Sequence, residues 1–176
     1  MRSRTRGVTF KSTLRMAGRL TIHVIDAASG SVIRTLSDHN TITYDAGNIV
    51  RALLAQRVAD PAPLEFSIGS MRFGTSGTVP TRYDTDLLGE VATVRKQLTD
   101  LQKVNGITGE ITWNATLDTT DANGYTLREA GIYTRGTTWD SGVGGNLKMF
   151  SRQVHAAIEK SSSLRLEYSW TYQFTA

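Results

Sequence analysis

The run from Leu164 to Phe174 alternates strictly between apolar and polar side chains. Leu, Tyr, Trp and Phe occupy its even-numbered positions, and Arg, Glu, Ser, Thr and Gln occupy the odd-numbered ones. Successive side chains of a β-strand point to opposite faces. The run therefore predicts a strand with one face on a hydrophobic core and the other in water or on a polar neighbour.

Similar alternation upstream predicts a mainly β protein. Residues 18–26 give a half-buried strand, Ser31–Ser37 returns as its hairpin partner, and Asn40–Thr43 extends that partner. A run ending at Phe73 is interrupted at Gly69-Ser70, where we expect a β-bulge.

Further strands are expected in the second half of the chain. Residues 91–104 form a long polar run, and residues 107–117 alternate cleanly around Trp113. Asn123-Gly124 is the signal of a tight hairpin, which would bring Tyr125–Tyr133 back beside the Trp113 strand. The last alternating runs are residues 147–158 and the one that ends at Phe174.

One segment changes period. From Asp45 to Gln56, apolar residues recur at the spacing of one helical face, and the prolines at 61 and 63 end the pattern. One short helix and about eight strands predict a single antiparallel β-sandwich, with which Greek-key and jelly-roll connections are both compatible. A chain of 176 residues, 39% of them hydrophobic, suffices for one such domain over residues 18–176.

Positive charge is concentrated at the start of the chain. Six basic residues precede the first acid, Asp26: Arg2, Arg4, Arg6, Lys11, Arg15 and Arg19. We interpret residues 1–17 as a basic arm whose bases contact an acidic protein neighbour or a nucleic-acid backbone, with the protein neighbour favoured. A solvated terminus without a partner remains the alternative.

The composition excludes several kinds of site. There is no cysteine, which rules out disulfides, thiolate chemistry and cysteine-based zinc sites. His23, His39 and His155 fall in three different elements without a nucleophile motif beside them. The longest apolar runs are too short to cross a bilayer, so we expect no membrane partner.

Other short patterns have a structural explanation. The carboxylate pairs Asp84/Asp86 and Asp118/Asp121 stand beside turn residues, where Asp caps backbone N–H groups. The segment from Asp121 to Gly124 lacks the terminal Glu of a calcium loop. Trp113, Tyr168 and Trp170 fit a sandwich core better than a platform for sugars or bases. We therefore expect no enzymatic activity, no cofactor and no metal.

The segment from Leu127 to Tyr133 combines an acid, two small residues and an aromatic residue at the end of a strand. Ala130 and Gly131 leave room for another backbone, and Tyr133 supplies apolar area. A buried carboxylate at Glu129 must find partners. We expect it to accept hydrogen bonds from buried backbone N–H groups, at a structural junction that also includes Phe73, Gly74 and Thr75.

An ordered set of motifs resembles a family of tailed-bacteriophage virion structural proteins, found among tail, baseplate and neck or collar components. The set comprises the helical segment Asp45–Gln56, Phe-Gly-Thr at 73–75, Asp-Thr-Asp-Leu at 84–87, Glu-Ala-Gly-Ile-Tyr at 129–133, Phe-Ser-Arg at 150–152, Lys160-Ser161, and the Trp-containing strand at 169–172. The resemblance covers residues 18–174 and rests on the order of the pieces.

The resemblance implies a non-enzymatic virion component, present in several copies as an adaptor or decoration protein of the tail, baseplate or neck-collar. Its expected partners are other virion proteins and further copies of itself, and its expected location is the virion, after assembly in the host cytoplasm. The alternative is a receptor- or glycan-binding module of a tail fibre or spike. In that case, aromatic residues near the glycine-rich loop at 136–146 would contact sugar.

Overall fold

The structure is a computed structural model that describes residues 15–54, 68–98, 103–105, 109–134 and 147–175. The arm residues Arg2, Arg4, Arg6 and Lys11 and the glycine-rich loop at 136–146 lie outside the described residues.

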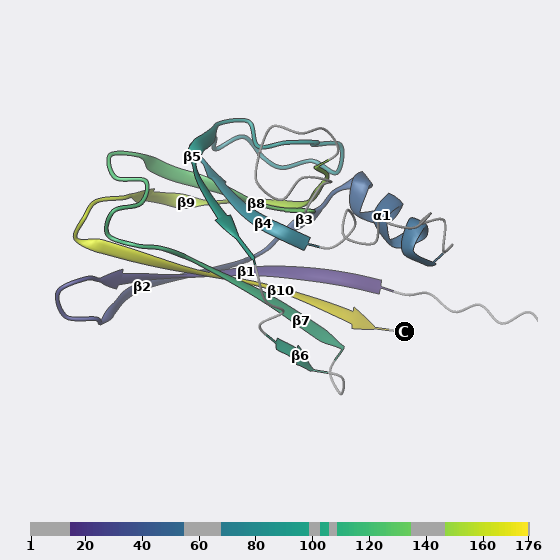
Figure 1. The fold of residues 1–176 in the computed structure, drawn as a ribbon, viewed down its shortest axis with the longest axis horizontal. Coiled ribbons are helices and arrows are strands. Elements are labelled where there is room, and N and C mark those ends of the chain that lie inside the picture. The colour runs from purple at the N-terminus through teal and green to yellow at the C-terminus, as the bar shows by residue number, and fades with distance from the viewer. Residues whose placement is uncertain (1–14, 55–67, 99–102, 106–108, 135–146, 176) are drawn as a thin grey trace, which may run out of the picture.

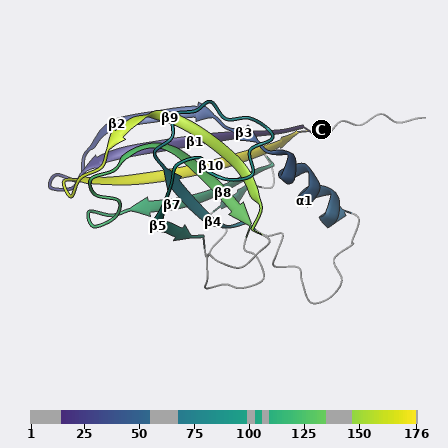
Figure 2. The ribbon, with the colours of Figure 1, turned by 90° about the horizontal axis from the view of Figure 1, so that it is seen from above.

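In the part of the chain that the structure describes, two five-stranded antiparallel sheets form a sandwich, with one helix at one end (Figures 1 and 2). The first sheet has the order β2 (Val32–His39), β1 (Arg15–Asp26), β10 (Leu164–Thr175), β7 (Glu110–Leu117) and β6 (Lys103–Asn105). The second sheet has the order β3 (Thr41–Ile42), β9 (Met149–Glu159), β8 (Thr126–Thr134), β4 (Ile68–Gly74) and β5 (Glu90–Gln97). The helix α1 spans Tyr44–Leu54. The mainly β sandwich with one short helix is thus confirmed.

The hydrophobic core lies between the two sheets. Strands β1 and β10 pair along their whole length, from Arg15 opposite Thr175 to Asp26 opposite Leu164. Their inward faces meet the second sheet, and the rings of Phe73 and Tyr168 lie 4.7 Å apart. Tyr168 and Trp170 are fully buried, which confirms them as core residues rather than a binding platform. Such rings each remove about 150–250 Å² from water, the dominant favourable contribution to folding.

The expected extension at Asn40–Thr43 is wrong, because the chain changes sheets there. The N–H of Asn40 still donates to the Gly18 carbonyl in the first sheet, at 3.1 Å. The next residues form β3, in which Thr41 lies opposite Arg152 of the second sheet. The Thr43 hydroxyl then accepts from the N–H of Ala46 at 3.4 Å and caps the start of α1.

The expected hairpin at Asn123-Gly124 is also wrong. Strand β7 belongs to the first sheet and β8 to the second, so this turn carries the chain between sheets. Ala122 and Gly124 have positive φ values of 53° and 85°, as a tight turn requires. The backbone of the turn bonds to the neighbouring crossing between β9 and β10, through Gly124 N–H to the Lys160 carbonyl at 2.9 Å. The turn signal is correct, but the flanking strands do not pair.

Three smaller features of the strands can be compared with the sequence predictions. Strand β1 begins at Arg15, so residues 15–17 belong to the sandwich rather than to the arm. The long run at 91–104 divides between β5 and β6, which lie in different sheets. The bulge expected at Gly69-Ser70 is confirmed by the register shift between Ile68 and Ser70.

Candidate interaction site: a loop held on a buried ion pair

The residues of the expected junction are adjacent on the second sheet. Gly74 of β4 lies opposite Glu129 of β8, and Phe73 lies opposite Ala130. On the other side of β8, Gly131 lies opposite Arg152 of β9. Ala130 joins the core between the sheets, whereas Glu129 contacts the loop that follows β4. The outer face of the second sheet is therefore polar at its centre and is covered by residues 75–89, which we call the display loop.

The carboxylate of Glu129 holds both ends of the display loop. Its side chain has no exposed surface, and it accepts backbone N–H groups from Gly89 at 2.7 Å, Ser76 at 3.3 Å and Leu88 at 3.4 Å. The expected contacts with backbone donors are thus present. A charged acceptor makes each of these bonds stronger than a neutral one would.

The partner that compensates the buried charge is Arg152. Its guanidinium is fully buried and donates through Nε to Glu129 at 2.8 Å. It also donates to the Asp84 carboxylate at 2.8 Å and to the Thr78 carbonyl at 3.1 Å, so one arginine joins β8 to two points of the display loop. Burial alone would raise the pKa of Asp84, but hydrogen bonds from Thr81 and Arg152 outweigh it and the pKa lies below its ordinary value.

Tyr133 forms a second attachment for the loop. Its hydroxyl donates to Asp86 at 2.5 Å and accepts the N–H of Leu87 at 3.0 Å. Burial and the neighbouring Asp86 raise the pKa of Tyr133. The Arg72 guanidinium lies 4.4 Å from the centre of its ring and is paired with Glu90 at 3.4 Å. The sheet thus binds the segment at 84–87 by ionic and polar contacts, and the cation–π contact with Arg72 holds the Tyr133 ring in place within the sheet.

Close backbone approach depends on Gly74. A Cβ at this position would lie 2.5 Å from Glu129 Oε1 and 2.7 Å from the Gly89 carbonyl oxygen. Both distances are shorter than van der Waals contact allows. The glycine of the Phe-Gly-Thr motif therefore makes room for the Glu129 carboxylate and for the returning end of the loop.

The outward side of the display loop carries exposed apolar and aromatic residues. Val79 is 77% exposed and Tyr83 is 73% exposed, and Leu88 is also exposed. Tyr44 at the start of α1 lies close by, since its N–H donates to the Arg82 carbonyl at 2.7 Å. The Arg82 guanidinium lies 5.9 Å from the Tyr44 ring centre and 5.3 Å from that of Tyr83. A hollow of about 240 Å³ lies between the two tyrosines, bordered also by Asp45 and Thr85.

His23 and His39 lie in strands of the first sheet, whereas His155 lies in β9 of the second sheet, next to the residue opposite Glu129. His23 bonds to the Thr35 hydroxyl on the first sheet, and burial lowers the pKa of His155. Within the described ranges, no group of three or more His, Asp or Glu side chains could hold a metal ion. The helix α1 is the one described helix, and it is neither long nor apolar enough to span a membrane.

Of the expected partner contacts, Arg15 and Arg19 are described. Both lie in β1, where they are exposed on the first sheet, away from the display loop. The sequence pattern did not predict Arg152 as the partner of Glu129, nor the loop attachments at Thr78 and Tyr133. The one available signal was a charged residue inside the strand-like run at 147–158, which indicates a buried charge only if a counter-charge lies nearby.

Comparisons of the chain with protein-family models, with curated proteins and with solved structures gave no match.

Replacing Glu129 by Ala should lower the free energy of unfolding by about 3–5 kcal/mol, because it leaves the Arg152 charge buried without its partner. The matched control is Glu167→Ala. That residue pairs with Arg165 at 2.9 Å with both side chains 43% exposed, and such a pair contributes only about 0–1 kcal/mol. Urea unfolding measures both changes.

The double variant Glu129→Leu/Arg152→Met should lose less free energy of unfolding than the sum of the losses in the single variants Glu129→Leu and Arg152→Met. Additive losses would show that the two charges do not act as a pair.

Replacing Gly74 by Ala should destabilise the protein by about 1–3 kcal/mol, because the new methyl group collides with Glu129 and with the Gly89 backbone. Gly77→Ala is the control in the same loop, since its Cβ would meet Arg128 only at an ordinary 3.5 Å. That change should stay within about 0.5 kcal/mol of the parent. Thermal and urea unfolding report both values. Equal effects of the two substitutions would contradict the close packing of the loop on the sheet.

Proposed function

We propose that this protein is a non-enzymatic structural subunit of a tailed-phage virion, an adaptor or decoration protein of the tail, baseplate or neck-collar that is present in several copies. It assembles with other virion proteins and with copies of itself. Its display loop provides a contact surface for a neighbouring protein.

The observation that carries this proposal is the attachment of the display loop. Fully buried charged side chains are directed at the loop rather than at a cleft, and their polar atoms are used in holding it. A loop ordered in this way presents Val79, Tyr83 and Leu88 to solvent in fixed positions. Binding to it then costs little conformational entropy, and exposed aromatic and arginine side chains are typical of the residues that dominate protein interfaces.

The resemblance to virion proteins supports the same proposal. Its motifs at 73–75, 84–87, 129–133 and 150–152 are separated along the chain, yet Gly74, Asp84, Glu129 and Arg152 all meet at the base of the display loop. The motifs thus share one structural task, which is to fix this loop on the sheet.

A receptor- or glycan-binding module is the second candidate. The hollow between Tyr44 and Tyr83 combines two aromatic rings with Asp45, Arg82 and Thr85. Aromatic faces with a few polar groups around them suit a sugar ring as well as a protein side chain.

Tyr83→Ala should lower incorporation of the protein into virions by about tenfold or more while leaving its melting temperature unchanged, because the side chain is exposed and removes only an external contact. Tyr125→Ala is the control, since Tyr125 is also exposed but lies next to the turn between the sheets. Quantitative mass spectrometry of purified virions measures the copy number of each variant.

Three results would change the proposal. A parent protein that is missing from the virions, or present in one copy, contradicts the structural role. Binding of host-surface polysaccharide that is lost in Tyr83→Ala, with normal incorporation, supports the glycan-binding candidate instead. Shortening of that polysaccharide by the parent protein contradicts the non-enzymatic assignment.

A further inference from the structure

An apolar groove runs between the edge strand β2 of the first sheet and β9 of the second. Its volume is about 430 Å³, and it is lined mainly by aliphatic side chains from both sheets: Val24, Ile33, Arg34, Ala157, Ile158, Glu159 and Leu164. Ile33 is 59% exposed at its border, and the neighbouring Val32 is similarly exposed. Exposed adjacent aliphatic residues beside an apolar groove are typical of a surface that another segment covers.

The groove lies beside an open strand edge. Among the described residues β2 pairs with β1 alone, so its other edge carries unpaired backbone groups, to which an extended peptide can add. On β9 the carbonyl of Ala157, which borders the groove, already accepts a hydrogen bond from the Arg34 guanidinium at 3.3 Å. The edge of β2 is therefore the better place for an additional strand to pair.

Residues 8–14 have the alternating sequence pattern of a β-strand. Val8, Phe10 and Leu14 are in phase with the inward-facing residues of β1, such as Met16 and Leu20, and only Ser12 interrupts the apolar series. Among the described residues, the pairing of β1 with β10 starts at Arg15 opposite Thr175. The alternating sequence pattern of β1 therefore continues about seven residues before the first described residue of the strand.

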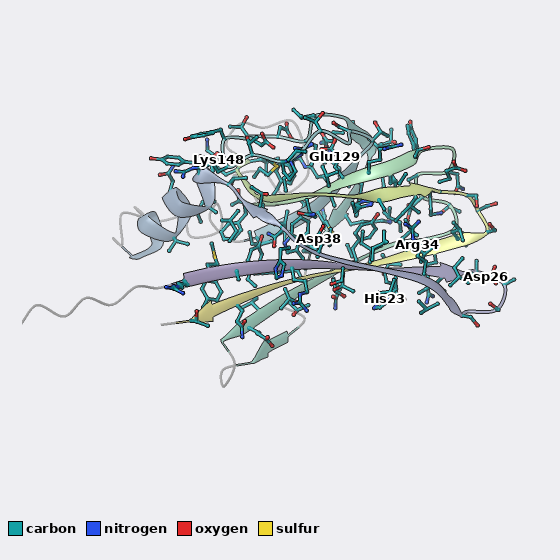
Figure 3. The ribbon with its side chains drawn as sticks, turned by 180° about the vertical axis from the view of Figure 1, so that it is seen from behind. His23, Asp26, Arg34, Asp38, Glu129 and Lys148 are labelled. Atoms are coloured by element: carbon teal, nitrogen blue, oxygen red, sulfur yellow. The ribbon has the colours of Figure 1, made fainter. Side chains whose placement is uncertain are left out.

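Residues 8–14 cannot reach the groove of their own chain. Arg15 and Val24 are nine residues apart along β1, which is about 30 Å at the rise of a β-strand. Val8 can lie at most about 25 Å from Arg15 even when the chain is fully extended. In Figure 3, Lys148 and Asp26 lie at opposite ends of the sandwich. Lys148 lies at the end that carries α1, where β1 begins, and Asp26 lies at the other end, where β1 finishes. The segment that fits the groove must come from a second molecule.

We propose that residues 8–14 of one copy add as a strand beside β2 of a second copy, with Val8 and Phe10 packed in the groove between β2 and β9. Seven residues span about 23 Å, which matches a β2 strand of eight residues. Glu159 in the groove and Asp38 on β2 offer carboxylates to the basic residues of the arm, such as Arg6 and Lys11.

This contact would join different surfaces of the two copies, because the arm precedes the start of β1 at one end of the sandwich and the groove lies toward the other end. A head-to-tail contact of this kind generates a ring if the rotation closes and a filament if it does not. The inference extends the proposed function, on which it rests for its biological setting, by naming the self-contact that builds the multi-copy assembly.

The natural absence of cysteine allows a direct test in solution with the full chain. Phe10→Cys and Ile33→Cys are made in separate, differently tagged copies, mixed, and oxidised, and the disulfide-linked heterodimer is quantified by mass. The control pairs Phe10→Cys with Ala92→Cys, which is exposed on β5, at the edge of the second sheet that lies farthest from β9. The proposal predicts a heterodimer yield at least about tenfold above the control, and loss of that yield when Val8 of the Phe10→Cys copy is also changed to Asp.

A heterodimer yield no higher than the control, at the highest protein concentration that stays soluble, would overturn the proposal. Sedimentation provides a second readout: removal of residues 1–14 should weaken self-association at least about tenfold without lowering the melting temperature. Unchanged self-association after this deletion would also overturn it. Neither measurement uses virions or the Tyr83 surface as its readout, so failure here leaves the proposed virion role standing, and failure of that role leaves a positive cross-link standing.

Discussion

The ion pair between Glu129 and Arg152 is the interaction on which the outer half of this structure depends. Both groups are fully buried, and removing two such charges from water costs several kcal/mol for each ion. The cost is offset because neither charge relies on the other alone. Glu129 accepts three backbone N–H groups as well, and Arg152 also reaches Asp84 and the Thr78 carbonyl. The two charges therefore have their full set of partners only while the display loop lies on the sheet.

This arrangement separates two tasks within one small domain. The core between the sheets, with its paired β1 and β10 and its buried aromatic rings, supplies the hydrophobic stability of the sandwich. The polar outer face of the second sheet supplies the conformation of the loop. Apolar residues in place of the ion pair could be equally stable, but they would not select one loop position by directional hydrogen bonds. We interpret the pair of Glu129 and Arg152 as the feature that fixes the display loop in one conformation.

The part of the fold that follows from local pattern could be predicted from the sequence. The alternation at Leu164–Phe174 indicates both the strand and its buried face, and Glu129 between small residues indicates a carboxylate that meets backbone donors. The strand connections could not be predicted. Asn123-Gly124 specifies the dihedral angles of a turn, but whether the strands on either side pair or enter different sheets depends on packing between distant segments. Arg152 was missed for the same reason, since its counter-charge lies on another strand.

The two exposed surfaces lie on different parts of the sandwich. The display loop covers the outer face of the second sheet, and the groove between β2 and β9 opens along one side. The surface proposed for a neighbouring protein and the surface proposed for a second copy therefore do not overlap.

The central claim is that the Glu129 carboxylate holds the display loop on the sheet, and amide hydrogen exchange measured by NMR tests it most directly. In the parent protein the N–H of Gly89 should exchange slowly, like the amides of β8. In Glu129→Gln that exchange should accelerate about a hundredfold, the factor that corresponds to about 3 kcal/mol, while the amides of β10 keep their rates. A Gly89 amide that exchanges rapidly in the parent, or whose rate is unchanged by the substitution, would contradict the account.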